Sequence, residues 1–191
     1  MKAVEKYNKL RQELKTGDIV LFHRKSLLAN IIQSADNSYY NHASIVYWLG
    51  DRLFTVDAWD NGTEIVPLSR RIKQYDDFCI VRKNNITPQE LRFACSNLIS
   101  RIEKDEPYGW LELVRRLIWL KVLNKNNKFS NIENWIAKKR LPVCSDVARE
   151  FGVDLGIVSY KSLILPTPED LKRHAQESET TVLWHDHKDK L

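Results

Sequence analysis

Cys144 is the residue whose position best suits nucleophilic chemistry. Pro142 disfavours helix just before it, and the residues after it are apolar at helical spacing: Val147, Ala148 and Phe151. A thiol at a helix N-terminus favours thiolate, and a cationic partner can lower its pKa from about 8.5 to roughly 3.5–7.5. The free N–H groups of that turn can bind an oxyanion. The alternative is a buried, inert cysteine that packs an ordinary helix.

A cysteine nucleophile needs a base and a third group that orients the base. Among five histidines, His42 is the one that begins a predicted strand, and Asp57 lies on the returning strand of the same hairpin; the others are His23, His174, His185 and His187. With a turn at residues 50–51, the pairing places His42 near Ala58 and Trp59, so Asp57 is close by. The alternatives are a histidine bonded to backbone and an acid in a salt bridge, and a one-residue slip would turn every side chain over.

Length and composition predict one globular domain over residues 1–191. The chain is 43% hydrophobic and 29% charged, with six Trp, seven Tyr and six Phe, which argues against disorder. Three cysteines are too few for a disulfide scaffold, and no CxxC pair is present, so we expect no structural metal and no cofactor.

The charge balance favours an anionic partner. The formal net charge is +5 and the pI is near 9.0, which does not by itself distinguish nucleic acid, an acidic wall polymer and phospholipid. We find neither an apolar signal core at the start nor a run of about 18 apolar residues, so the expectation is a reducing, cytoplasmic setting that leaves Cys144 free.

The elements that must position these residues read as strands followed by helices. A polar helix is predicted over residues 3–14 with Val4, Tyr7, Leu10 and Leu14 on one side, and a capped helix over 26–35. The predicted strands are 19–22, 41–49, 52–58, 63–68 and 78–82, and their tight turns indicate an antiparallel meander.

Helices dominate the second half. Thr87, Pro88 and Glu90 form a capping signature for a helix that we expect to end at Glu103. Further helices are predicted over 110–123, from Ser130, from Cys144 to a stop at Gly152, and at 167–171, with a last strand at 180–184. The tail from residue 185 is expected to fray.

Six short motifs in this order resemble the circularly permuted papain-like amidases, the YiiX/YaeF-like group of the NlpC-type superfamily. They are GDIVLF (17–22), NHASIV (41–46), VDA (56–58), YGW (108–110), VCSDV (143–147) and PTPEDL (166–171). The resemblance covers residues 15–184, and its specific part is the order, with the histidine before the cysteine. It implies an α+β fold in which an antiparallel sheet or half-barrel packs on the helix that bears the cysteine.

The resemblance also assigns roles. Cys144 is the nucleophile, His42 the base and Asp57 the group that orients it, although many members carry glutamate at this third position, which keeps Glu64 as a fallback. Tyr108 matches a family tyrosine near the site that would hold oxyanion or substrate, or else is a helix-capping aromatic. The relatives act on peptide amides in cell-wall fragments, on protein amides or on lipid acyl groups.

A helical insertion is expected at about residues 109–140. It carries three of the six tryptophans and a cluster of Lys and Arg. It reads as an amphipathic lid or membrane-surface element, as a nucleic-acid surface, or as a helical hairpin packed on the core. Cys79 and Cys95 read as core residues, and a metal site at His185 and His187 is disfavoured against a frayed tail.

Three hypotheses follow. The first is a cysteine hydrolase, an amidase or peptidase that cleaves peptide or cell-wall peptide through Cys144, His42, Asp57 and a thioester acyl-enzyme. The second is a lipid-directed thiol acyltransferase or thioesterase. The third is a non-catalytic module that binds anionic polymer or a membrane surface; nucleic acid is the least favoured partner.

Overall fold

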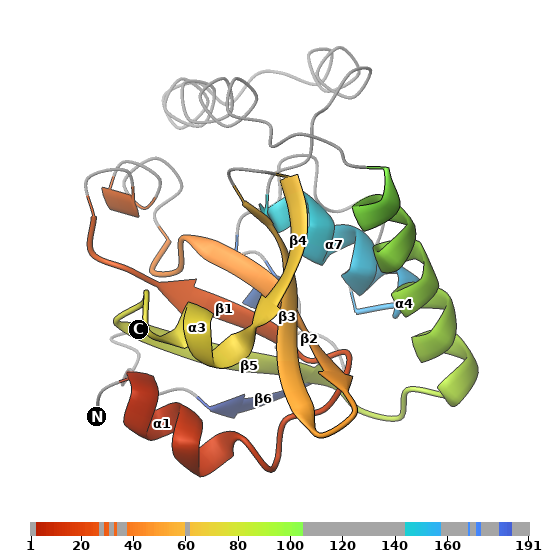
Figure 1. The fold of residues 1–191 in the computed structure, drawn as a ribbon, viewed down its shortest axis with the longest axis horizontal. Helices are drawn as coiled ribbons and strands as arrows, with labels where there is room; N and C mark the ends of the chain where they lie inside the picture. The colour runs from red at the N-terminus through yellow and green to blue at the C-terminus, as the bar shows by residue number, and fades with distance from the viewer. Residues whose placement is uncertain are drawn as a thin grey trace.

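A six-stranded antiparallel sheet forms the centre of the part that the structure, a computed structural model, describes (Figure 1). The described residues are 3–26, 29–30, 33, 38–59, 62–104, 144–157, 168, 171–172 and 180–184. The strand order is β4-β3-β2-β1-β5-β6. The strands are β1 (Ile19–His23), β2 (His42–Leu49), β3 (Arg52–Trp59), β4 (Gly62–Pro67), β5 (Asp77–Lys83) and β6 (Thr180–Trp184). With the helices below, this confirms the α+β class.

The predicted hairpin is present. Leu49 lies opposite Arg52, and Gly50 in the turn between them has a φ of 61°, a conformation that glycine adopts without strain. The expected meander holds from β1 to β4 but is wrong for β5, which pairs with β1 on the far side of the sheet. The reason is α3 (Leu68–Ile72), a short helix that the sequence pattern did not predict.

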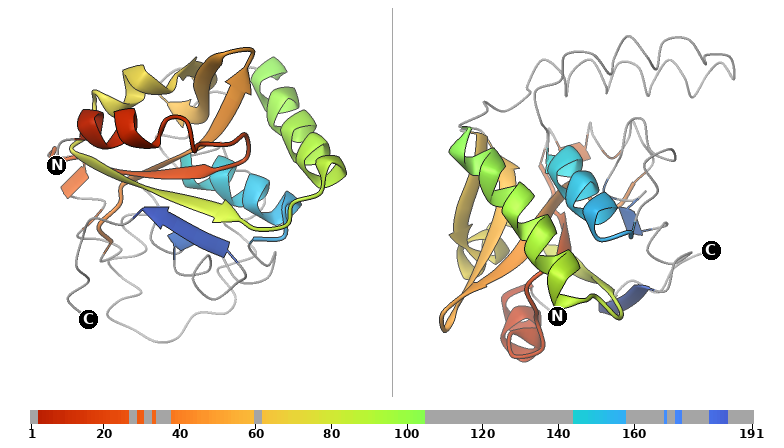
Figure 2. Two further views of the ribbon diagram at one scale, coloured as in Figure 1. Left: turned by 90° about the horizontal axis from the view of Figure 1, so that it is seen from below. Right: turned by 90° about the vertical axis from the view of Figure 1, so that its right-hand side faces the viewer.

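The two faces of the sheet carry separate apolar clusters. Helices α4 (Pro88–Glu103) and α7 (Cys144–Asp154) cover one face, and α1 (Ala3–Leu10) and α3 cover the other (Figure 2). Alternate residues of each strand point to opposite faces, so Leu21 joins the α7 side and Phe22 the α1 side. The sheet is therefore buried on both faces.

The first helix differs from its prediction. It ends at Leu10 rather than at residue 14, and Val4 is 40% exposed, whereas Lys6 is buried in its place. Lys6 is tolerated because its Nζ lies 2.8 Å from Asp77 Oδ1 and also donates to the carbonyl of Phe78.

Helix α4 is confirmed with its capping box. The hydroxyl of Thr87 accepts from the backbone N–H of Glu90, and the Glu90 carboxylate accepts from the backbone N–H of Thr87. The Cys144 helix is longer than predicted, because it continues through Gly152 to Asp154, and Gly156, with a φ of 67°, follows its end.

Several predictions fall outside the described residues. They include the helical insertion at 109–140, most of the short helix at 167–171, and the tail from 185. The strand at 180–184 is confirmed as β6. Within the described ranges, no helix has the length and apolar character needed to cross a membrane.

Candidate active site

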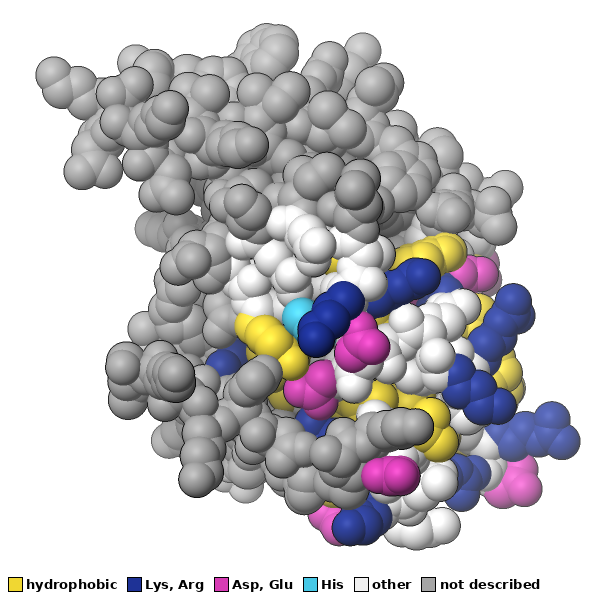
Figure 3. Space-filling model, turned by 90° about the vertical axis from the view of Figure 1, so that its left-hand side faces the viewer, with side chains coloured by type: hydrophobic (Ala, Val, Ile, Leu, Met, Phe, Trp, Pro, Cys, Tyr) yellow, Lys and Arg dark blue, Asp and Glu magenta, His cyan; other side chains and the backbone are white. Residues whose placement is uncertain are grey.

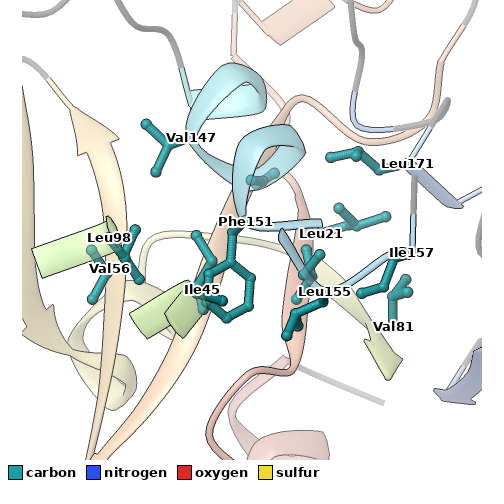
Figure 4. Packing of buried hydrophobic residues seen from close by; sticks show 14 of the residues in the cluster. Leu21, Ile45, Val56, Val81, Leu98, Val147, Phe151, Leu155, Ile157 and Leu171 are labelled. Carbon is teal, nitrogen blue, oxygen red and sulfur yellow. The ribbon is translucent and has the colours of Figure 1, made fainter. Parts of the chain in front are cut away.

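Helix α7 presents Cys144 at its first residue and is held from two sides. Its inner side packs on the sheet through Val147 and Phe151, and Leu155, directly after its end, joins the same apolar cluster (Figure 4). On its outer side, Asn97 of α4 donates to Asp154 over 2.9 Å, and Arg101 and Glu150 form an ion pair. These contacts fix the axis of the helix, and therefore the position of its N-terminus.

His42 begins β2, and Asp57 lies near the end of β3. The Nε2 atom of His42 is 2.6 Å from Oδ2 of Asp57, and both side chains are buried. The imidazole ring is stacked against Tyr75 and Phe22, with ring centroids 5.7 and 5.9 Å away, and meets Trp59 edge-on at 5.1 Å. Aromatic rings thus fix the orientation of the imidazole and shield its bond to Asp57 from water.

The register explains how residues on different faces meet. The β2–β3 ladder runs from Leu49 opposite Arg52 to Ile45 opposite Val56, so His42 lies beyond its last pair and is paired with β1 alone within the described register. The expected approach of His42 to Trp59 is therefore made by side chains. His42 and α7 lie on opposite faces of the sheet. The sulfur of Cys144 nevertheless reaches His42, because the contact is made beyond the last residue pair of the β2–β3 ladder.

Two donors meet the sulfur of Cys144. One is the His42 ring, and the other is the backbone N–H of Ala43. Because Nε2 of His42 is engaged by Asp57, the nitrogen available to the sulfur is Nδ1. The structure therefore brings together the three residues predicted for the site: Cys144, His42 and Asp57.

The electrostatics of the pair favour its charged form. Burial raises the pKa of Cys144, but the His42 imidazolium and the Ala43 N–H outweigh this effect and lower it below its ordinary value. Burial likewise lowers the pKa of His42, but the Cys144 thiolate and the Asp57 carboxylate raise it from 6.5 to about 9. Thiolate and imidazolium stabilise each other, which is the arrangement that makes a cysteine nucleophilic near neutral pH.

Arg71 is a site residue that the sequence reasoning missed. Its Nε lies 3.2 Å from Oδ2 of Asp57 and its Nη2 3.1 Å from Oδ1, and Nη2 also binds the carboxylate of Glu64. A signal was available: Asp57 lies directly opposite Glu64 on neighbouring strands, and two facing carboxylates require a cation. Glu64, the fallback third residue, is bound to Arg71, whereas Asp57 is bound to His42.

Tyr75 was not singled out by the sequence either. Its ring lies almost parallel to that of His42, at an interplanar angle of 8°, and its buried hydroxyl has no hydrogen-bond partner among the described residues. Burial, with the nearby Asp57 and Cys144 charges, raises its pKa well above the ordinary value. The hydroxyl therefore stays protonated beside the imidazole.

Two other cysteines were predicted to be core residues: Cys79 is buried as expected, and Cys95 is half-buried. Tyr108, the predicted substrate-binding residue, is outside the described residues. Figure 3 shows one face of the molecule, on which a histidine reaches the surface among hydrophobic, basic and acidic side chains.

Comparisons with known proteins bear on the fold and the chemistry. A family model described as permuted papain-like amidase enzyme, YaeF/YiiX, C92 family, matches residues 13–110, a stretch that contains His42 and Asp57 and ends before Cys144. A solved structure, titled as the crystal structure of metalloprotein yiiX from Escherichia coli O157:H7, DUF1105, superposes with a TM-score of 0.51. It is 16% identical over 74% of this chain and 67% of that chain, which supports the fold alone.

The search of curated proteins found no match. In the described part of this chain, no group of three or more His, Cys, Asp or Glu side chains is arranged to hold a metal ion.

Proposed function

The chain belongs to the permuted papain-like amidase family of YaeF and YiiX, and from this premise we propose that it cleaves an amide bond with Cys144 as its nucleophile. Membership supports a cysteine amidase or hydrolase in general. The finer proposal is a peptide or cell-wall peptide substrate, a triad of Cys144, His42 and Asp57, and a thioester acyl-enzyme.

The observation that carries the proposal is the mutual effect of sulfur and imidazole. Each raises the charged fraction of the other, although both are buried. Without such a partner, burial raises the pKa of a cysteine, as it does for the half-buried Cys95. Cys144 is thus distinguished from Cys95 by the chemistry of its neighbours.

Acylation begins with attack of the Cys144 thiolate on the carbonyl carbon. The new C–S bond moves the carbonyl π electrons onto oxygen, where the free N–H groups at the start of α7 can bind the oxyanion. As the carbonyl re-forms, the C–N bond breaks, and the Nδ1 proton of His42 passes to the leaving amine. The products are a thioester and a neutral imidazole.

Deacylation returns the proton. Neutral His42 takes a proton from water as the water oxygen attacks the thioester carbon, and the C–S bond breaks to release a carboxylic acid and the Cys144 thiolate. Asp57 keeps Nε2 as the protonated nitrogen of the neutral ring and stabilises the imidazolium in both steps. The cycle ends with the thiolate–imidazolium pair that began it.

Substrate profiling tests the proposal. Wild type and the Cys144→Ala variant are compared on cell-wall peptides, other peptides and acyl lipids, with Cys95→Ala as a matched control. Cleavage of a peptide amide that is lost in Cys144→Ala and kept in Cys95→Ala supports it. Turnover of acyl lipids alone would contradict the amidase proposal and support the lipid-directed alternative. If no substrate is turned over and Cys144 is unreactive, the protein is not a cysteine hydrolase.

A further inference from the structure

Arg71 makes more contacts with the site than a surface arginine would. Its guanidinium binds both oxygens of Asp57, contacts Glu64, receives support from Gln74 Oε1 at 3.2 Å, and lies over the Trp59 ring at 4.6 Å. The residue is 3% exposed. A buried arginine whose planar fork is fully engaged is oriented as firmly as the residues it binds.

The charges of the buried groups balance only when Arg71 is included. The Cys144 thiolate and Asp57 carry two negative charges, and the His42 imidazolium carries one positive charge. The Arg71 guanidinium supplies the second, since Asp57 and Glu64 outweigh the effect of burial and raise its pKa. Without it, the cluster would hold an uncompensated negative charge away from water, which is costly.

We propose that Arg71 is the positioning residue of this site: it orients Asp57 toward His42, and its charge keeps the sulfur of Cys144 ionised. The proposal rests on the proposed function and deepens it. When the guanidinium is removed, one of the nearby anions should take up a proton. That anion is the Cys144 thiolate, because a thiol is a far weaker acid than the carboxylic acids of Asp57 and Glu64. Arg71 therefore acts on the nucleophile through Asp57 and His42 and touches no substrate.

A variant at Glu64 can distinguish the two effects of Arg71, which are the orientation of Asp57 and the ionisation of the Cys144 sulfur. It is bound to the same guanidinium but is partly exposed, with 31% of its side chain accessible, and no contact with His42 is found among its described interactions. Its negative charge opposes the thiolate without orienting the imidazole. Removal of Glu64 should thus act on Cys144 in the opposite direction from removal of Arg71.

The test is the pH dependence of alkylation of Cys144 by iodoacetamide, which needs no substrate. All variants also carry alanine in place of Cys79 and Cys95, so that Cys144 is the single thiol whose alkylation is measured. In Arg71→Gln we expect the midpoint of the acid limb to rise by about one pH unit, from the loss of one buried charge at an effective dielectric constant near 20. Arg71→Lys keeps the charge, so its midpoint should stay near that of wild type.

Two controls bracket the result. Arg70→Gln removes the same charge from an exposed position on the same helix and should leave the midpoint unchanged. Glu64→Gln should lower the midpoint. An Arg71→Gln midpoint equal to that of Arg70→Gln, in a protein with native circular dichroism, overturns the proposal. If Arg71→Gln does not fold, Glu64→Gln decides: a lower midpoint supports the proposal, and an unchanged or higher midpoint contradicts it.

The outcome is distinguishable from failure of the proposed function. If Cys144 of the wild type reacts no faster than a free thiol at neutral pH, it is not a reactive thiolate, and the proposed hydrolase function is contradicted as well. A reactive wild-type Cys144 whose pH dependence is insensitive to Arg71 leaves the hydrolase standing and removes only the role of Arg71.

Discussion

At the scale of single residues, the proposed chemistry depends on one imidazole that is bound at both nitrogens. His42 donates through Nε2 to Asp57 and faces the Cys144 sulfur with Nδ1. The flanking rings of Tyr75 and Trp59 prevent it from turning. A fixed ring can hand its proton to a leaving group without first reorganising, which is the advantage of a preorganised site.

The pKa of His42 predicts where activity is lost at high pH. Because it is raised from 6.5 to about 9, the imidazolium persists below pH 9 and loses its proton above it. Amide hydrolysis should fall as the pH rises through about 9, since the leaving amine then lacks a proton donor. Alkylation of Cys144 should not fall there, because it needs only the thiolate. A hydrolysis rate that declines near pH 6.5 would contradict this assignment.

The hydroxyl of Tyr75, which has no hydrogen-bond partner in the part of the chain that the structure describes, predicts a stabilising substitution. A buried hydroxyl without a hydrogen bond costs about 1–3 kcal/mol, so Tyr75→Phe should raise the free energy of unfolding by about 1 kcal/mol. The ring contacts with Phe22 and His42 remain. Urea denaturation measures the difference, and Tyr7→Phe on α1, outside the site, is the control. A loss of stability in Tyr75→Phe would indicate that the hydroxyl has a partner.

At the scale of elements, α4 supports α7, and α7 carries Cys144, the proposed nucleophile. The capping box at Thr87 sets where α4 begins, and polar contacts from Asn97 and Arg101 join the two helices. At the other end of α7, Lys83 donates to the carbonyl of Leu155, where a cation is favourable against the helix dipole. Cys144 is therefore positioned by contacts all along its helix.

The capping box predicts a modest stability effect. Thr87→Ala removes the side-chain acceptor for the Glu90 N–H and should cost about 1 kcal/mol. In a chain of this size that lowers the melting temperature by roughly 2–4 °C. Ser96→Ala in the exposed middle of α4 removes a hydroxyl with no capping role and should be neutral or slightly stabilising. Equal melting temperatures for the two variants would contradict the role of the cap.

At the scale of the whole molecule, the site lies where two packed layers meet. The apolar cluster on the α7 side includes Ile45, Val56 and Phe151, and the cluster on the other face includes Phe22 and residues of α1. His42 contacts the second cluster, and Cys144 begins the helix that packs on the first. Both layers must therefore be formed before the two residues can meet.

This coupling predicts that a remote core substitution lowers both stability and reactivity. Phe151→Ala removes a ring that is 2% exposed and should cost about 3–5 kcal/mol, with slower alkylation of Cys144. Phe93→Ala, the same change at a side chain that is 59% exposed, should stay within about 0.5 kcal/mol of wild type. Calorimetry and alkylation rates are the two measurements. Normal alkylation in a destabilised Phe151→Ala would show that the helix N-terminus is held independently of this ring.

The sequence by itself determined the local elements and the residue types of the site. The turn at Gly50 defined the hairpin, Thr87 and Glu90 defined the start of α4, and Cys144 was placed at a helix N-terminus. These features depend on neighbours within a few positions, so the order of residues contains them. The pairing of strands across the turn at residues 50–51 likewise placed Asp57 close to His42.

Only the tertiary structure decided which groups surround the pair. The pairing of β5 with β1 and the end of the β2–β3 ladder next to His42 are features of the tertiary structure. The binding of Arg71 to Asp57 rather than to solvent requires that α3 packs over β3. Contacts between residues far apart along the chain form where apolar faces can be buried and buried charges can be paired at the same time. No local pattern specifies them, because each is the outcome of packing the whole chain.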